Sequence, residues 1–422
     1  MAQEDGAQEG AGRVAGATFI NPGWNISNVP RKVDADREKA LLRALTAMGP
    51  RNLAAVARSL GMPEETVRYK LRKFYERGLA FSVFVDLLKL GLRPYYAELM
   101  FSPRWRPSAG QLLQSMYGYS YISYYTGYLT GSYMTAHFSM PYGAGGHLRR
   151  LLDEMAEMGI LEEYRLRSAA WVSYKGVDPD FFDPDAGEWD VDWDRVRPLE
   201  ELPERVDYPE ERPPAEFDYY DLLIVSELQQ DARIAVADMA KRTGANEKTL
   251  SYHFNRHVTE NGIVKGYILK WWGAHYAKTN TVSYLELAIS GIRRRDVDSL
   301  RRSLEALPFA YSSRLLEEGE PTYMLYIAMP PNYFNQSITW LRDRLSELSV
   351  LDNTSFRLLD ARESMSFTVP LELYNRERES WTIKVDELVE KLRAVVRMVE
   401  GAGAPPQEPR GATASGESKL GQ

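Results

Sequence analysis

The feature that most constrains the fold is a residue pattern that occurs twice in the chain, at an offset of 183 residues. Four spaced positions carry the same or a similar residue in both stretches, and these pairs are Gly61 and Gly244, Thr66 and Thr249, Tyr69 and Tyr252, and Leu71 and Phe254. Arg77-Gly78-Leu79 then matches Asn261-Gly262-Ile263, after one residue inserted in the second stretch. Because self-similarity at a fixed spacing marks a repeated structural unit, we expect two copies of one fold.

The second stretch, residues 217–270, carries the signals of three helices and a strand. Asp218 and Asp221 form a variant of the capping pair that begins a helix, and the apolar residues after them follow helical spacing. Gly244 supplies the tight turn between the second and third helices, and Asn246 caps the third helix. Residues 263–269 are expected to form a strand, and the first stretch repeats the whole scheme from residue 36.

The third helix of each stretch is expected to carry the binding residues. Leu250, Phe254 and Val258 take every fourth position and should face the core, which leaves polar and cationic side chains outside. Such side chains suit the base edges and phosphates of a DNA major groove. The residues expected to bind double-stranded DNA are Glu65, Thr66, Arg68, Tyr69, Lys70, Arg72, Lys73, Lys248, Thr249, Ser251, Tyr252, His253, Asn255 and Arg256.

Two histidines on the second of these helices offer another interpretation. His253 and His257 are four residues apart on one helix face and could bind a metal ion. Their position on the helix that would read DNA favours a contact with phosphate or base instead. We therefore expect no metal site.

The segments DLLIVSELQQDARI, MAKRTG, TLSY and ENGIVKGY, together with the spacing between them, resemble the winged helix of the Lrp/AsnC (feast-or-famine) family of transcriptional regulators. The resemblance covers residues 217–270 and implies a winged helix-turn-helix that binds DNA, present as a tandem duplication in this chain. A three-helix core that only packs, or that binds protein, is the alternative, because a fold alone does not establish DNA binding.

Each three-helix stretch is followed by the order strand-helix-strand-strand-helix-strand, which is ferredoxin-like. Tyr133-Met134 and Met140-Pro141 in the first half recur as Tyr323-Met324 and Met329-Pro330 in the second. The pattern is similar to the small-molecule-sensing domain that follows the winged helix in Lrp/AsnC proteins. We therefore expect an α+β fold with two winged helix-turn-helix domains, each followed by a ferredoxin-like α/β-sandwich domain.

The family resemblance also implies an assembly. Lrp/AsnC proteins pair two sensing domains from two subunits, and here both could come from one chain, as an intrachain pseudo-dimer; a homo-oligomer is also open. The family's effector pocket usually includes a Gly-x-x-Asp pattern, but Met134 and Thr322 stand at the Asp positions after Gly131 and Gly319. A small-molecule effector therefore stays an open alternative.

The domain boundaries follow from these patterns and from composition. Residues 178–218 hold 16 Asp and Glu against four Arg and are rich in proline, which is typical of an extended linker. The expected parts are a disordered arm (1–33), the first winged helix (34–90), the first ferredoxin-like domain (91–175), the linker (176–216), the second winged helix (217–273), the second ferredoxin-like domain (274–375), an amphipathic helix (376–400) and a disordered tail (401–422).

Composition excludes several classes of protein. The chain has no cysteine, which excludes disulfide frameworks, cysteine-ligated zinc and thiol nucleophiles. It has no signal-peptide core and no run of 18 apolar residues, so we expect a cytoplasmic protein without membrane contact.

The predicted function is a sequence-specific, DNA-binding transcriptional regulator with two non-identical heads, without a cofactor and without catalytic residues. Siroheme decarboxylases, which act on a tetrapyrrole, also combine a winged helix with a ferredoxin-like domain and carry a histidine motif resembling VSHNY. The matching stretches here, ISYY at 122–125 and YSSR at 311–314, contain no histidine, so we expect no enzyme. An architectural or protein-interaction module is a third alternative.

Overall fold

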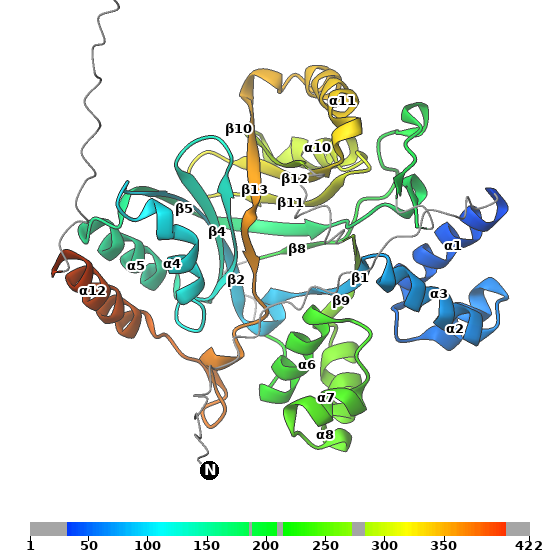
Figure 1. Cartoon of the computed structure of the whole chain (residues 1–422), viewed down its shortest axis with the longest axis horizontal. Coiled ribbons are helices and arrows are strands. Elements are labelled where there is room, and N and C mark those ends of the chain that lie inside the picture. The colour runs from blue at the N-terminus through cyan, green and yellow to red at the C-terminus, as the bar shows by residue number, and fades with distance from the viewer. Residues whose placement is uncertain (1–31, 185–187, 209–213, 272–282, 402–422) are drawn as a thin grey trace, which may run out of the picture.

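The computed structural model describes residues 32–184, 188–208, 214–271 and 283–401 (Figure 1). The fold class is α+β as expected, with two winged helix-turn-helix domains that are each followed by a ferredoxin-like domain. Most of the predicted N-terminal arm and the predicted tail after residue 401 lie outside the described residues. None of the helices in the described ranges is long and apolar enough to cross a bilayer.

The two winged-helix domains have the same element order. Head 1 contains α1 (Lys32–Met48), α2 (Leu53–Leu60), α3 (Glu64–Glu76) and strand β1 (Leu79–Val85). Head 2 contains α6 (Tyr219–Gln230), α7 (Val236–Thr243), α8 (Glu247–His253), a π-helical turn (Phe254–Glu260) and strand β9 (Val264–Trp271).

Local sequence signals explain where the helices of head 2 begin and end. The side chain of Asp218 accepts hydrogen bonds from the first turn of α6, and Asp221 accepts one in return from the Asp218 amide, so the predicted capping pair is confirmed. Asn246 caps α8 as predicted. Gly244 has φ 71° and its counterpart Gly61 has φ 61°, a left-handed conformation that glycine adopts at little cost where a helix must end in a tight turn.

The π-helical turn is the structural consequence of the inserted residue. Head 2 gains its extra residue between Phe254 and Asn261, and the π-helix spans Phe254–Glu260. A single residue inserted into an α-helix is accommodated as one wider turn of this kind. In head 1, α3 runs without such a turn.

The two heads are joined to each other. Strand β1 pairs antiparallel with β9, with Leu79 opposite Trp271 at one end and Val85 opposite Val264 at the other. Each wing strand therefore pairs with the wing strand of the other head. The guanidinium group of Arg51 also lies over the ring of Phe254, 4.1 Å from its centroid. This shared ribbon fixes the two heads relative to each other.

We refer to the two ferredoxin-like domains, in chain order, as the first sandwich and the second sandwich. The first contains β2 (Leu92–Phe101), α4 (Ala109–Ser115), β3 (Ile122–Tyr128), β4 (Tyr133–Pro141), α5 (Gly145–Glu157) and β5 (Leu161–Tyr174). The second contains β10 (Ser283–Ser290), α10 (Val297–Leu304), β11 (Ala310–Leu316), β12 (Thr322–Met329), α11 (Phe334–Glu347) and β13 (Thr354–Ser366).

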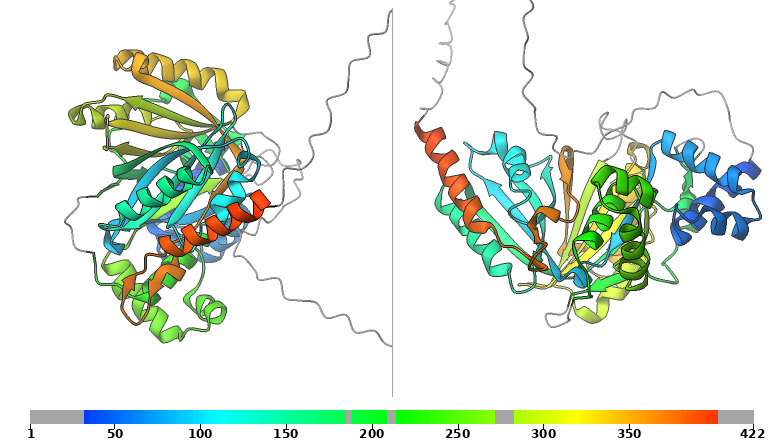
Figure 2. Two further views of the ribbon diagram at one scale, coloured as in Figure 1. Left: turned by 90° about the vertical axis from the view of Figure 1, so that its left-hand side faces the viewer. Right: turned by 90° about the horizontal axis from the view of Figure 1, so that it is seen from below.

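The strands of both sandwiches form one sheet. Their order is β11-β12-β10-β13-β3-β4-β2-β5, and β5 also pairs with β11, so these eight strands close into a ring. A short linker strand, β8 (Arg205–Asp207), adds to β5. Helices α4 and α5 cover the outer face of the first sandwich, and α10 and α11 cover that of the second (Figures 1 and 2). The inner faces of the two sandwiches enclose a common interior.

The segments outside the repeats pack onto the repeats. In the linker, Phe182 of β6 (Phe182–Asp183) is fully buried, and Trp189 of β7 (Glu188–Trp189) meets Phe309 of the second sandwich with ring centroids 4.7 Å apart. A hairpin of β14 (Tyr374–Asn375) and β15 (Ser380–Trp381) precedes helix α12 (Val385–Gly401). Helix α12 lies against α5, where Arg393 pairs with Glu154 at 2.7 Å.

Candidate functional site

The third helices α3 and α8 both turn a polar face to solvent. Tyr69 on α3 is 52% exposed and its counterpart Tyr252 on α8 is 57% exposed, which is unusual for aromatic side chains. The other predicted residues that are exposed are Glu65, Arg68, Arg72, Lys248, Asn255 and Arg256, and those half-buried at the edges of the same faces are Thr66, Lys73, Thr249 and Ser251. The structure thus brings 12 of the predicted DNA-binding residues together on two outward faces.

Among the described residues, the ion pairs that these cations form are with carboxylates of their own helices. Arg68 pairs with Glu64 at 2.7 Å, Lys73 with Glu76 at 2.6 Å, and Arg256 with Glu260 at 2.9 Å. Exposed pairs one helical turn apart are screened by solvent and stabilise a helix only weakly. A phosphate could therefore displace the carboxylates at little cost.

Two of the predicted DNA-binding residues do not lie on the outward faces. Lys70 pairs with the buried carboxylate of Glu38 on α1, and His253 is buried against Asp221 on α6. Each residue comes three positions after a core residue, Val67 or Leu250, and so falls on the inward stripe of its helix. The sequence prediction assigned only every fourth position to the core face, and it therefore did not recognise that Lys70 and His253 face inward.

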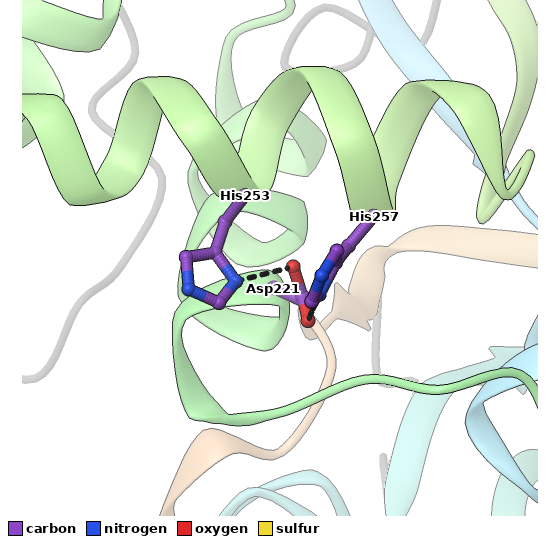
Figure 3. Close-up of side chains that lie close together, drawn as sticks. All are labelled: Asp221, His253 and His257. Carbon is purple, nitrogen blue, oxygen red and sulfur yellow. Dashed lines mark hydrogen bonds and ion pairs between the residues drawn. The ribbon is translucent and has the colours of Figure 1, made fainter.

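Asp221, His253 and His257 form a compact cluster between α6 and the third helix of head 2 (Figure 3). The Nδ1 atom of His253 lies 3.1 Å from Oδ1 of Asp221, and Nδ1 of His257 lies 3.0 Å from Oδ2. The side chain of Asp221 is fully buried, and burial raises its pKa. His257 was not among the predicted binding residues.

A second polar centre lies in the interior enclosed by the two sandwiches, around Glu286 of β10. Glu286 is fully buried, and its two oxygens accept hydrogen bonds from the hydroxyl groups of Tyr96 (3.1 Å), Tyr128 (3.1 Å) and Tyr326 (2.9 Å). The guanidinium of Arg357 donates to Glu286 over 3.1 Å. The four side chains that contact Glu286 come from four different strands of the ring, β2, β3, β12 and β13.

Burial shifts the protonation equilibria of this centre. It raises the pKa of Glu286 and raises that of the Tyr96 and Tyr326 hydroxyls well above their usual range. It lowers the pKa of His137, aided by the charge of Arg314, so this imidazole is neutral at pH 7. His137 Nε2 lies 3.1 Å from the Tyr326 hydroxyl. The centre therefore combines a neutral imidazole and protonated tyrosine hydroxyls around one buried carboxyl group.

The centre also contains a cation with spare hydrogen-bonding capacity. Arg314 of β11 is buried, and its guanidinium lies 4.9 Å from the centroid of the Tyr326 ring. Its Nε–H has no hydrogen-bond acceptor among the described residues. A buried guanidinium with an unused donor is suited to bind a carboxylate.

The sequence comparison had found no histidine in the stretches that match the VSHNY motif. The structure places His137, from the neighbouring strand β4, beside Tyr124 of the first of these stretches, with ring centroids 5.0 Å apart. A comparison along one strand could not show a residue supplied by the next. The sequence signal that could have indicated the polar centre was Glu286, a carboxylate between Leu285 and Leu287 in strand β10.

Comparison with known proteins gives one family match and similar solved structures. Residues 217–264 match the protein family described as winged helix-turn-helix DNA-binding. No curated protein matches the chain. The crystal structure of the siroheme decarboxylase NirDL is similar with a TM-score of 0.52 at 10% identity, covering 86% of this chain and 99% of that one. Its co-complex with an iron-uroporphyrin III analogue gives a TM-score of 0.50 with the same identity and coverage.

These similarities change one expectation. At 10% identity the likeness to NirDL shows a shared fold, and it covers 86% of this chain. The expectation that the protein is not an enzyme is therefore wrong, because it rested on a missing histidine motif while an enzyme has the same overall architecture.

Proposed function

We propose that this protein is a transcriptional regulator of the Lrp/AsnC type, in tandem form, that binds double-stranded DNA through α3 and α8. The observation that carries the proposal is the match of residues 217–264 to winged helix-turn-helix DNA-binding domains. The outward faces of α3 and α8 support it, because they combine exposed cations with hydrogen-bonding groups and one exposed tyrosine each.

The connection between the heads supports binding of both heads to one duplex. Because β1 and β9 form a shared ribbon, the two third helices keep a fixed separation. Proteins that present two such helices read half-sites whose centres lie about one helical turn, roughly 34 Å, or a multiple of it apart. Head 1 presents Arg68 and Arg72 where head 2 presents Ser251 and Asn255, so the two half-sites should differ in sequence.

Selection of the full-length chain against random duplexes tests this proposal. We expect an enriched site with two unequal half-sites at one fixed spacing. Arg68→Ala should relax the base preference in one half-site only, and Arg256→Ala in the other, by roughly 1–3 kcal/mol for a residue that contacts a base. Arg342→Ala, which removes an exposed arginine from α11, is the matched control. Enrichment of no sequence by the wild-type chain would contradict the proposal.

A second function, binding and conversion of a tetrapyrrole, is supported by the polar centre around Glu286. A solved structure with the same fold holds an iron-uroporphyrin III analogue. The carboxylates of such a ligand would suit the buried guanidinium of Arg314, and the neutral imidazole of His137 could form a hydrogen bond with it. DNA binding and this activity use different parts of the chain and do not exclude each other.

The tetrapyrrole function is tested by titrating iron-uroporphyrin III with the full-length chain and recording visible absorbance. We expect a saturable spectral change that His137→Ala alters and that His147→Ala, on the exposed surface of α5, leaves as in the wild type. No spectral change with the wild-type chain would refute this second function and leave the DNA-binding proposal intact.

A further inference from the structure

The two heads differ at one buried pair of positions that joins the first and third helices. In head 1 this pair is Glu38 on α1 and Lys70 on α3, which form an ion pair. The same offset of 183 residues relates these positions to Asp221 and His253 in head 2. A carboxylate is thus kept on the first helix of both heads, while its partner changes from an ammonium group to an imidazole.

Head 2 adds a second imidazole to this pair. His257 lies within the π-helical turn that head 1 lacks, and its ring meets that of His253 with centroids 4.7 Å apart. Nδ1 atoms of both rings are directed at the two oxygens of one carboxylate, Asp221 (Figure 3). Neutralising a single buried carboxylate needs one basic group, as head 1 shows. Neutralisation of Asp221 therefore does not explain the second histidine.

We propose that Asp221, His253 and His257 bind a divalent transition-metal ion of the Zn²⁺ class. The three ligand atoms, two nitrogens and one oxygen, all lie within 4.8 Å of one another. Two histidines four residues apart on one helix face, completed by a carboxylate, form a ligand set that Zn²⁺ accepts, with a solvent molecule in the fourth position. Imidazole ligands also suit Ni²⁺ and Cu²⁺.

The surroundings fit such an ion. Asp221 is fully buried and His253 nearly so, while the side chain of His257 is 18% exposed and leaves a route from solvent. To bind the ion, both Nδ1 atoms must be unprotonated, so each ring carries its proton on Nε2. The ion would tie the third helix to α6. Head 1 cannot bind a metal ion in this way, because the protonated amine of Lys70 has no lone pair.

The proposal does not depend on the DNA-binding function, because it is tested without DNA. The full-length chain is freed of metal with a chelator and titrated calorimetrically with Zn²⁺. We expect one site per chain, and we expect His253→Gln and His257→Gln each to weaken it at least about tenfold, since loss of a group behind a ligand already costs 10–100-fold. His147→Gln removes an exposed histidine from α5 and should bind as the wild type does.

Two further measurements keep the test decisive if a variant folds poorly. Co²⁺ bound to the wild-type chain should give the visible absorption spectrum of a low-coordinate ion with nitrogen ligands. Zn²⁺ should raise the melting temperature of the wild-type chain and that of His147→Gln. Absence of both effects in the wild type, or Zn²⁺ affinity of His257→Gln equal to that of the wild type, would overturn the proposal and show that the cluster is a set of hydrogen bonds only.

Discussion

At the scale of single residues, the polar centre makes the folded chain sensitive to acid through His137. This imidazole stays neutral when buried, because burial lowers its pKa well below the usual range. In the unfolded chain it takes up a proton below a pKa of about 6.5. The unfolded state then binds more protons than the folded state, so the free energy of unfolding falls as the pH drops below that value.

Replacing His137 should remove this contribution. We expect His137→Asn to lessen the fall in unfolding free energy between pH 6.5 and 5.5 by up to about 1.4 kcal/mol, the value for one proton per pH unit. Chemical denaturation at a series of pH values measures the difference. His147→Asn, in which an exposed histidine is changed, is the matched control for the substitution itself. Equal slopes for His137→Asn and the wild type would mean that His137 is protonated in the folded chain.

The sequence indicated most residues of the outward faces but not the direction of every side chain. Tyr69 and Tyr252 were identified because they recur at the repeat offset, and both are exposed. Lys70 and His253 occupy equivalent positions at the same offset, yet they point inward to a carboxylate on another helix. Residue type and offset do not reveal the acidic partner, because the first helix meets the third only in the folded head.

At the scale of elements, capping signals predicted helix starts well. Asp218 and Asn246 cap α6 and α8 through hydrogen bonds to the first-turn amides. Strand ends set by distant pairing were not predictable in this way. Strand β13 continues to Ser366, because Met365 and Ser366 pair with Tyr125 and Tyr124 of β3. That pairing joins the two sandwiches, and the residues next to the strand end carry no sequence pattern that indicates it.

The cap of α8 provides a test at this scale. Asn246→Ala removes the acceptor of the Lys248 and Thr249 amides, so we expect a loss of about 1 kcal/mol in the free energy of unfolding. It should also weaken DNA binding through head 2. Denaturation followed by circular dichroism measures the first effect. Asn335→Ala, at an exposed position on α11, is the control and should change stability by less than about 0.5 kcal/mol.

At the scale of the whole molecule, the two halves of the chain depend on each other. The ring of eight strands is closed by two seams, β5 with β11 and β13 with β3, and the heads share the β1–β9 ribbon. Each half alone would expose three unpaired strand edges in addition to the side chains that line the interior of the ring. Exposed edges of this kind promote aggregation.

Cutting the chain between Tyr208 and Pro214 tests this dependence. We expect each half to aggregate when it is expressed alone, and the two halves to copurify as a soluble one-to-one complex when they are expressed together. Size-exclusion chromatography distinguishes the two results. Two soluble, monomeric, independently folded halves would contradict the closed ring.

The most direct test of the central claim, that the heads bind DNA through α3 and α8, is the salt dependence of duplex affinity for a triple variant. Arg68→Ala, Arg72→Ala and Arg256→Ala are combined and compared with Arg293→Ala, Arg295→Ala and Arg342→Ala, which remove the same charge from exposed sites on the second sandwich. We predict that the first variant loses affinity and that its slope of log K against log salt becomes shallower, by about 1 for each of the three arginines that contacts a phosphate, while the control keeps wild-type binding. Unchanged affinity of the first variant for every duplex would contradict the account.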